Sequence, residues 1–282
     1  MIDIAMIDIA NDEFRMLRDV IRRRLGLYFD DSKEYLLRSR LQGRLLKSRV
    51  ETFAQYCAYL DGAAEREAEW DELASVLSNN ETYFFRERAQ LDILAGPFLD
   101  AALSARRPLR IWSAACSSGE EPYSLAMKLL ESGRAEPGAF SIVASDLSPR
   151  ALERARTGFY RELAFRAMPP ELIEKYFRPF EGGFFIAEPV KSMVRFSRVN
   201  LLDAHAVERV RAQDAIFCRN VLIYFDKPTQ LEVAERLSRA LAPGGALFLG
   251  HAESLLHSKS PLEPVITKNA VYYRQAGHAA RH

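Results

Sequence analysis

Residues Ile111–Ser124, with the sequence IWSAACSSGEEPYS, decide the fold of this chain. The apolar run Leu109–Ala115 predicts a β-strand and the amphipathic stretch 120–133 predicts an α-helix, with a turn of small residues between them. Small side chains let a ligand approach the backbone closely, and the first turn of a helix offers free N–H groups. The stretch therefore predicts a nucleotide-type βα turn. The structural alternative is a tight turn before a capped helix.

The acidic residues around this turn indicate the kind of ligand. The turn lacks the full GxGxxG set of glycines, and Glu120 and Glu121 would repel a pyrophosphate but suit a cationic ligand. Asp146 ends the next predicted strand, Phe140–Ser145, where a carboxylate can accept hydrogen bonds from both hydroxyls of a ribose. An aspartate at a strand end is also often a helix cap, a role for which Ser148 competes. Because it follows the first motif, Asp146 is a better candidate for a ribose contact than it would be alone, and a dinucleotide pyrophosphate is disfavoured.

Strands and helices alternate along the rest of the C-terminal region, which predicts an α/β domain with a mostly parallel, covered sheet. The further predicted elements are helices at 149–156 and 227–241 and strands at Asp214–Cys218, Ala246–Gly250 and Ala270–Arg274. Phe177–Val190, with a turn at its middle, and then Met193–Phe196 interrupt this alternation. We therefore expect an α/β domain at 91–282 that carries a small antiparallel β-insert at about 177–198.

The N-terminal region differs in pattern and in charge. It has no proline between residue 11 and about 90, and its apolar residues recur at helical spacing, which predicts an all-helical domain at 11–90. Between Glu13 and Val50 there are 11 Lys/Arg against 5 Asp/Glu, and between Glu51 and Ser75 there are 7 acidic residues and 1 basic. A basic pair of helices is therefore expected beside an acidic segment.

The overall composition excludes several classes of protein. A net charge of +1 over 282 residues argues against a general nucleic-acid coat, and 48% apolar residues argue against intrinsic disorder. No apolar run is long enough for a membrane span, and the acidic start is unlike a secretory signal. No CxxC pair exists, and the HxxxH spacing of His278 and His282 lies at the extreme C-terminus. We expect a cytoplasmic, metal-free protein that binds no nucleic acid and does not insert into membranes.

Three further stretches combine polar and apolar residues. Ser78–Glu87 (SNNETYFFRE) is rich in aromatic residues and lies where the two predicted domains meet, a favoured place for ligands. In Ile216–Asp226 (IFCRNVLIYFD), polar residues within an apolar run would be costly if buried and unpaired, so they should meet a ligand or each other. Gly250–Ser254 (GHAES) contains His251, a possible base, although a lone histidine at a strand end is more often structural.

In their order along the chain, these motifs resemble those of the chemotaxis receptor methyltransferases, the CheR family. The resemblance covers nearly the whole chain and rests on Asn80-x-Thr82-x-Phe84-Phe85-Arg86, Ala114–Ser124, Ser145-Asp146, Asn200-Leu201, Cys218–Phe225 and Gly250–Ser254. It implies a Rossmann-like methyltransferase domain with an inserted β-subdomain, preceded by a helical domain. It also implies an enzyme that uses S-adenosylmethionine (SAM), leaves S-adenosylhomocysteine, and forms methyl esters on glutamates of membrane chemoreceptors in chemotaxis adaptation or a related pathway.

The resemblance also implies roles for individual residues. It implies cofactor contacts at Asn80, Thr82, Arg86, Glu120 or Glu121, Asp146, Asn200, Leu201, Arg219 and Asn220, and it places Arg86 and Tyr224 near the transferring methyl group. The basic helical face would suit glutamate-rich receptor helices, with docking candidates at Arg38, Arg40, Arg44 and Lys47. For any single one of these, a solvated surface is the alternative. The β-insert resembles a subdomain that in some members grips a tethering peptide at the receptor C-terminus.

Two other classes of function stay open at this point. One is a nicotinamide-dependent dehydrogenase on the same architecture, against which the missing glycines and the two carboxylates after the turn argue. The other is a non-catalytic module that binds the cofactor as a sensor, although nothing in the motifs departs from the family pattern.

Overall fold

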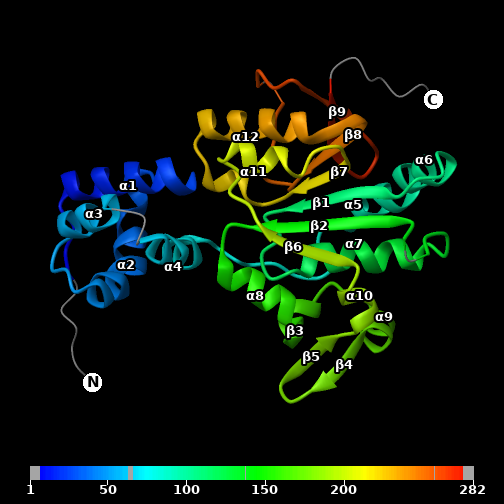
Figure 1. The fold of residues 1–282 in the computed structure, drawn as a ribbon, viewed down its shortest axis with the longest axis horizontal. Coiled ribbons are helices and arrows are strands. Elements are labelled where there is room, and N and C mark those ends of the chain that lie inside the picture. Colours follow the sequence, from blue (N-terminus) through cyan, green and yellow to red (C-terminus); the bar gives the residue numbers. More distant parts are fainter. Residues whose placement is uncertain (1–6, 63–65, 137, 257, 276–282) are drawn as a thin grey trace. The chain divides into compact units, whose positions relative to one another are not determined.

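The computed structural model describes residues 7–62, 66–136, 138–256 and 258–275, and the chain forms two compact units (Figure 1). The first unit is Met1–Asn79 together with Tyr224–Thr229, and the second is Asn80–Ile223 together with Gln230–His282. Among the described helices, none is both long and apolar enough to cross a membrane.

The first unit is helical, as predicted. Its helices are α1 (Asn11–Leu25), α2 (Glu34–Ser48), α3 (Phe53–Asp61) and α4 (Glu67–Leu77), with a short 3-10 turn η1 (Asp31–Lys33) before α2. The residues at helical spacing form its core, since Leu17 and Ile21 of α1 and Leu37 and Leu41 of α2 are fully buried.

The second unit is built on a seven-stranded sheet of order β6-β2-β1-β7-β8-β10-β9. Its strands are β1 (Leu109–Ala114), β2 (Phe140–Asp146), β6 (Val194–Arg198), β7 (Gln213–Cys218), β8 (Leu241–Leu249), β9 (Leu262–Ile266) and β10 (Val271–Gln275). The first five strands of that order run parallel, and β10 is antiparallel to both of its neighbours. Because the carboxyl ends of parallel strands share one edge, the segments that follow β6, β2, β1 and β7 meet there.

Helices cover both faces of this sheet. In Figure 1, α11 (Ala204–Glu208) and α12 (Lys227–Ala240) lie on one side, and α7 (Glu120–Glu131) and α8 (Pro149–Thr157) lie on the other. The first helices of the unit are α5 (Arg88–Ile93), a π-helical turn η3 (Leu94–Phe98) and α6 (Leu99–Ser104). The doubly covered, mainly parallel sheet confirms the predicted fold class.

A small antiparallel sheet of order β3-β5-β4 lies apart from the large one in Figure 1. Its strands are β3 (Phe159–Tyr160), β4 (Phe177–Phe180) and β5 (Gly183–Ile186), and the short helices nearby are η4 (Glu162–Phe165), α9 (Pro170–Tyr176) and α10 (Glu188–Lys191). The predicted insert at 177–198 differs from this sheet at both ends. It includes β6, which pairs with β2 in the large sheet, and omits β3, whose two residues are too few to show a period.

The aromatic residues after Asn80 pack into the second unit. Phe84 is fully buried and its ring contacts those of Tyr160, Phe165 and Phe177, while Phe85 is 3% exposed in the same core. Their burial explains why residues 80–90, which we expected in the helical domain, belong to the second unit.

Candidate active site

The turn between β1 and α7 has an unusual backbone. Ala115, Ser117 and Gly119 all have positive φ, of 65°, 50° and 96°, and left-handed residues other than glycine cost about 1–2 kcal/mol each. At Gly119 a Cβ atom would lie 2.9 Å from Cβ of Ala155 and 3.0 Å from the hydroxyl of Tyr160, so glycine is required there. Strained turns of this kind persist where the surrounding structure holds them, and they concentrate at functional sites.

Asp146 holds this turn from the end of β2. Its side chain accepts hydrogen bonds from the backbone N–H groups of Ser117, at 2.8 Å, and Ser148, at 2.9 Å. The residue is 8% exposed, and burial raises the pKa of its carboxyl. An ionised carboxylate has about four acceptor sites, so two remain for a ligand. Ser148 caps α8, because its hydroxyl accepts the N–H of Ala151. Asp146 is therefore not needed as the cap of this helix and remains available at the strand-end edge of the sheet.

The two glutamates after the turn have different surroundings. Glu121 accepts hydrogen bonds from the hydroxyl of Ser113 and from Nε of Arg219, both at 2.6 Å, so a guanidinium already pairs with its charge. Glu120 accepts from the hydroxyl of Ser118 at 2.8 Å, and burial raises the pKa of its carboxyl to about 7. Because Glu121 is already paired with Arg219, Glu120 is the better candidate of the two for binding a cationic ligand.

Arg219 and Asn220 follow β7, and they meet other protein groups, as the sequence allowed. The Arg219 side chain is 3% exposed and, besides Glu121, donates to the backbone carbonyl of Arg86 at 2.8 Å. Asn220 adopts a left-handed conformation with φ of 60° and donates its N–H to the carboxylate of Glu253 at 2.7 Å. The segment after β7 is thus fixed by side chains from α7 and from the end of β8.

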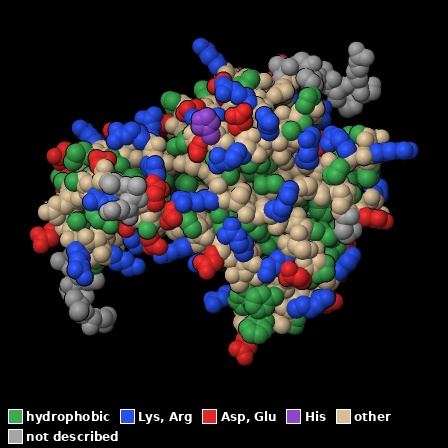
Figure 2. All heavy atoms as spheres, in the orientation of Figure 1, with side chains coloured by type: hydrophobic (Ala, Val, Ile, Leu, Met, Phe, Trp, Pro, Cys, Tyr) green, Lys and Arg blue, Asp and Glu red, His purple; other side chains and the backbone are tan. Residues whose placement is uncertain are grey.

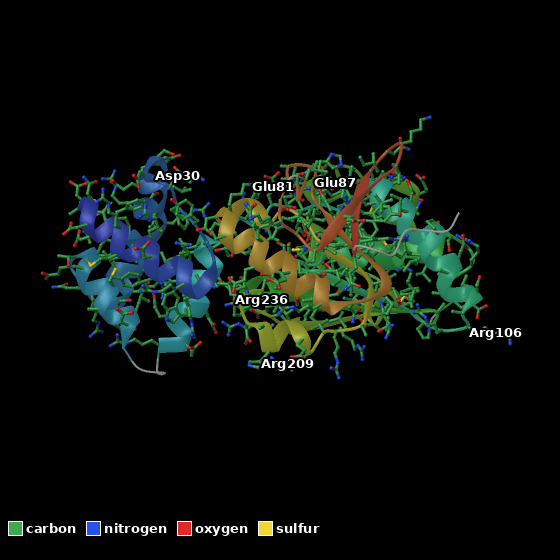
Figure 3. All side chains as sticks on the ribbon, turned by 90° about the horizontal axis from the view of Figure 1, so that it is seen from above. Asp30, Glu81, Glu87, Arg106, Arg209 and Arg236 are labelled. Atoms are coloured by element: carbon green, nitrogen blue, oxygen red, sulfur yellow. The ribbon has the colours of Figure 1, made fainter. Side chains whose placement is uncertain are left out.

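The segment from Asn80 to Glu87 lies beside the turn after β1. The carbonyl of Asn80 accepts from the hydroxyl of Ser117 at 3.3 Å, and the side chain of Arg86, 27% exposed, donates to the carbonyl of Glu81 at 3.4 Å. Thr82, two residues from Asn80, is half-buried. Glu87, labelled in Figure 3, has a buried Oε2 that accepts no hydrogen bond from the described residues.

Two further predicted residues follow β6. Asn200 accepts the N–H of Leu202 at 3.0 Å through its side chain, and Leu201 is 6% exposed. Arg236 of α12, labelled in Figure 3, donates to the carbonyl of Leu201 at 3.3 Å. The structure thus brings residues from the ends of β6, β2, β1 and β7 to one edge of the sheet.

Tyr224 lies in the first compact unit. It ends the 3-10 turn η5 (Leu222–Tyr224), and its carbonyl accepts the N–H of Tyr28 at 2.8 Å. Nearby in that unit, Arg22 pairs with Asp226 at 2.6 Å.

The predicted docking residues on α2 differ in availability, and Arg44 is a correction. Arg44 is 8% exposed and pairs with Glu69, at 2.9 Å through Nε, and with Glu72 at 2.7 Å, so it stabilises the helical core and has little surface for a substrate. Arg38 pairs with Asp8 at 2.7 Å, Arg40 donates to the carbonyl of Leu77 at 2.6 Å, and Lys47 is exposed. Helical periodicity places charges on a face but cannot identify a buried partner.

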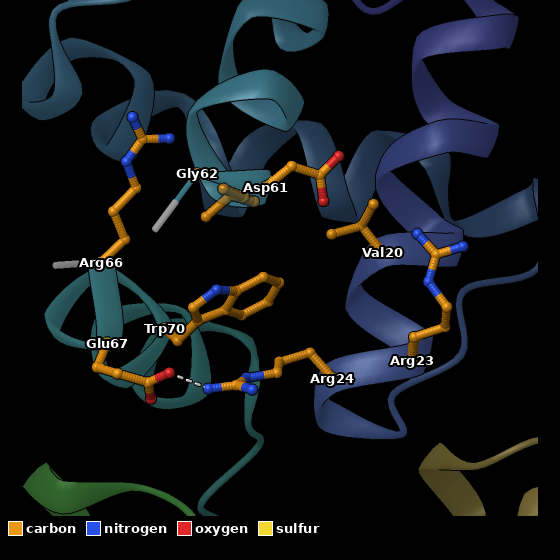
Figure 4. Close-up of a pocket in the computed structure, with 9 residues that line it drawn as sticks. Val20, Arg23, Arg24, Asp61, Gly62, Arg66, Glu67 and Trp70 are labelled. Atoms are coloured by element: carbon orange, nitrogen blue, oxygen red, sulfur yellow. Dashed lines mark hydrogen bonds and ion pairs between the residues drawn. The ribbon is translucent and has the colours of Figure 1, made fainter. Parts of the chain in front are cut away.

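The helical unit also has a cavity of about 370 Å³, drawn in Figure 4. Arg23, Arg24, Arg66 and Trp70 line it, together with Asp61 and Glu67. An ion pair between Arg24 and Glu67 offsets one of the positive charges. We assign no ligand to this cavity.

Sequence reasoning missed two acidic residues at the sheet edge. Glu87 and Glu253 both lie in motifs quoted above, but neither was assigned a role. A single acidic residue in a loop belongs to no repeating pattern that would indicate its partners. No group of three or more His, Cys, Asp or Glu side chains suitable for a metal occurs among the described residues, and His278 and His282 lie outside them. His251 is exposed, with Nε2 3.8 Å from Glu87.

Comparison with known proteins identifies the family. The family model "CheR methyltransferase, all-alpha domain" matches residues 12–78, and "CheR methyltransferase, SAM binding domain" matches residues 80–271. The chain is 39% identical over 253 residues to Chemotaxis protein methyltransferase 2 of Pseudomonas aeruginosa, with 88% of this chain and 89% of that protein covered. It is 37% identical over 251 residues to Chemotaxis protein methyltransferase 2 of Vibrio cholerae, with 88% and 87% covered. It is 36% identical over 253 residues to the Chemotaxis protein methyltransferase of Escherichia coli, with 88% and 86% covered. This chain therefore belongs to the CheR family of SAM-dependent methyltransferases.

Proposed function

We propose that this chain transfers the methyl group of SAM to glutamate side chains of chemoreceptors and forms glutamyl methyl esters. The observation that carries the proposal is the pair of buried carboxylates at the strand-end edge, Asp146 and Glu120, in a chain that matches the CheR models over both of its units. Family membership also removes the dehydrogenase alternative.

The residues at this edge fit the cofactor. SAM has a ribose diol, which Asp146 would bind, and a cationic amino group, which Glu120 would bind. The strained turn after β1 would bring backbone close to the ligand. Asn220 follows the neighbouring strand β7, and Asn200 and Leu201 follow β6, two strands from β1. Oε2 of Glu87, which lies 3.7 Å from Nη1 of Arg219 and accepts no hydrogen bond from the described residues, is a further buried acceptor. We propose the same role for Asn80, Thr82, Arg86 and Arg219, with Arg219 acting mainly through its pairing with Glu121.

The reaction needs alignment more than proton transfer. When bound, SAM supplies an electrophilic methyl group on a sulfonium. A glutamate side chain has an ordinary pKa of about 4.3, so the acceptor is already ionised at neutral pH and requires no general base. Holding reacting groups in line can lower a barrier by roughly 7–11 kcal/mol. We propose that Arg86 attracts and orients the acceptor carboxylate and that Tyr224 positions it.

The receptor would contact two surfaces. Arg38, Arg40 and Lys47 on α2 would steer an acidic receptor helix, and transfer rates that do not change with ionic strength would contradict this. The small sheet offers β4 as an edge strand, with Phe180 60% exposed, and Figure 2 shows a group of apolar side chains where Figure 1 draws this sheet. An edge strand with adjacent apolar side chains suits an added peptide strand, such as a receptor C-terminus. Receptors shortened at that end should be methylated more slowly if it binds there.

A labelled-methyl assay tests the function directly. The enzyme, SAM with a labelled methyl group and receptor-bearing membranes should give protein-bound label that base releases as methanol. Base-stable label would indicate a different acceptor. Absence of label despite measurable SAM binding would support the sensor alternative.

A further inference from the structure

The loop after β7 has few backbone partners of its own. From Arg219 to Ile223 the chain forms no strand, yet Leu222 is buried and Asn220 and Val221 are half-buried. Backbone N–H groups removed from water need acceptors, and a loop at this depth has no ladder to supply them. Asn220 also has a positive φ of 60°, a conformation that must be held from outside.

Glu253 supplies the missing acceptors from the end of β8. Its Oε2 accepts the N–H of Asn220 at 2.7 Å, and its Oε1 accepts those of Val221 at 2.8 Å and Leu222 at 2.7 Å. Oε1 also lies 3.4 Å from the N–H of Ile223, and Oε2 accepts that of Gly250 at 2.7 Å. Glu253 is 8% exposed, so one buried carboxylate fixes the whole loop.

Gly250 belongs to the same arrangement. A Cβ atom at this position would lie 2.5 Å from Nδ2 of Asn220 and 2.9 Å from Oε2 of Glu253. The side chain of Asn220 therefore occupies the space that the absent side chain leaves. Arg219, the preceding residue, is held by Glu121. Two carboxylates from different elements thus set the orientation of both strand-end residues.

We propose that Glu253 is a positioning residue for methyl transfer, which orients Asn220 toward the cofactor and fixes the start of the segment that leads to Tyr224. The inference rests on the function proposed above. Glu253 is not a proton acceptor in the reaction, because its oxygens are saturated by N–H donors and the substrate carboxylate needs no base. Its effect reaches the reactants through Asn220 and the loop backbone.

The main test is Glu253→Gln in the full chain. The amide has the shape of the carboxylate, but one oxygen is replaced by an NH2 group, a donor that faces the N–H groups of the loop. The loop therefore loses some of the hydrogen bonds that fix it. We expect SAM affinity, measured by calorimetry, to fall about tenfold, and kcat at saturating SAM to fall by a similar factor. The matched control is Asp214→Asn at the other end of β7. Asp214 is also buried, and accepts the N–H of Arg110 at 2.8 Å, but it lies far along the strand from the loop.

The outcomes separate positioning from stability. If Glu253→Gln and Asp214→Asn lower the melting temperature alike and only Glu253→Gln changes Kd and kcat, the proposal holds. Equal kinetic changes in both variants, or normal Kd and kcat in folded Glu253→Gln, would overturn it. If Glu253→Gln does not fold, Gly250→Ala tests the same point by displacing the Asn220 side chain, and normal SAM affinity in that variant would count against positioning.

The same experiments distinguish this inference from the proposed function. Calorimetry with SAM reports on Asn220 whether or not a receptor is methylated. A wild-type enzyme that binds SAM but labels no receptor would therefore refute the proposed substrate while leaving the Kd comparison valid.

Discussion

The turn after β1 and the loop after β7 are each held by one carboxylate, Asp146 at the end of β2 and Glu253 in the turn after β8, but the two carboxylates accept different numbers of hydrogen bonds. Asp146 accepts two backbone N–H groups, from Ser117 and Ser148. Glu253 contacts five, of which the Ile223 contact is the longest. A carboxylate has about four acceptor sites, so Asp146 keeps capacity for a ligand and Glu253 keeps none. Between these two carboxylates, the number of N–H donors thus separates the one that can bind a ligand from the one that supports the loop.

We expect the largest loss of SAM affinity when Asp146, the carboxylate with acceptor sites left for a ligand, is removed. In Asp146→Ala, two charge-assisted hydrogen bonds to a ribose would be lost, which is about 3 kcal/mol or on the order of a hundredfold in SAM affinity. Calorimetry measures this. Asp30→Ala is the control, since Asp30 also accepts a backbone N–H, that of Ser32, in the helical unit. If SAM affinity is unchanged in Asp146→Ala, Asp146 supports the fold without binding the ligand, and the difference drawn between Asp146 and Glu253 is wrong.

The strain of the first turn gives the next prediction. Gly119→Ala places a Cβ 2.9 Å from that of Ala155 at a φ of 96°, and should lower the free energy of unfolding by about 2 kcal/mol. Gly133→Ala is the control, with φ of 65° and nothing within 4 Å of the added Cβ. Urea denaturation of both variants gives the difference. Equal losses would mean that the turn after β1 is no more tightly packed than an ordinary helix end.

The third prediction concerns pH and Glu120. Burial raises the pKa of Glu120 to about 7, above its usual 4.5, so the neutral form is favoured in the ligand-free protein. That protein should lose stability as pH rises from 4.5 to 7, because the unfolded chain ionises first. If the ionised form binds the cationic amino group, SAM affinity should fall by up to about tenfold for each pH unit below 7 and level off above it. Glu120→Gln should flatten this profile. A profile that survives in Glu120→Gln would assign it to another group.

The smallest effect is expected at Tyr224, where the loop after β7 ends. If this segment positions groups and moves no proton, Tyr224→Phe should retain activity within about tenfold of wild type, with unchanged SAM affinity. Initial rates at saturating SAM measure the loss. A complete loss of transfer with normal SAM binding would instead give the hydroxyl a chemical role and weaken the contrast between the two loops.

Much of the fold was predictable because it depends on local patterns. The strands now seen as β1, β2 and β7 and the helices α7, α8 and α12 were each predicted within a few residues, since apolar runs and amphipathic stretches mark buried strands and covered faces. Strand β9 was missed. It contains Pro264 and pairs only with β10, as edge strands do, and so shows no clear alternation.

The site was predictable in part, for a different reason. Asp146 and the turn after β1 follow from the general chemistry of strand ends, whereas Asn80 and Asn200 came only from the family resemblance. No sequence pattern indicated which residues that are distant in the chain would form hydrogen bonds with each other. Arg44 looked like a surface charge because Glu69 lies 25 residues away, and Glu253 had no role because four of its five donors lie 30 to 33 residues away.

The membership of Tyr224–Thr229 in the helical unit limits how this protein can be dissected. The chain crosses between the compact units after Asn79, after Ile223 and after Thr229. A fragment that starts at Asn80 would keep every strand yet lack Tyr28 and Arg22, the partners of Tyr224 and Asp226. Such a fragment could bind SAM while its residues 224–229 had lost their support. Cofactor binding by an isolated second unit would therefore be a poor measure of whether that unit can carry out catalysis.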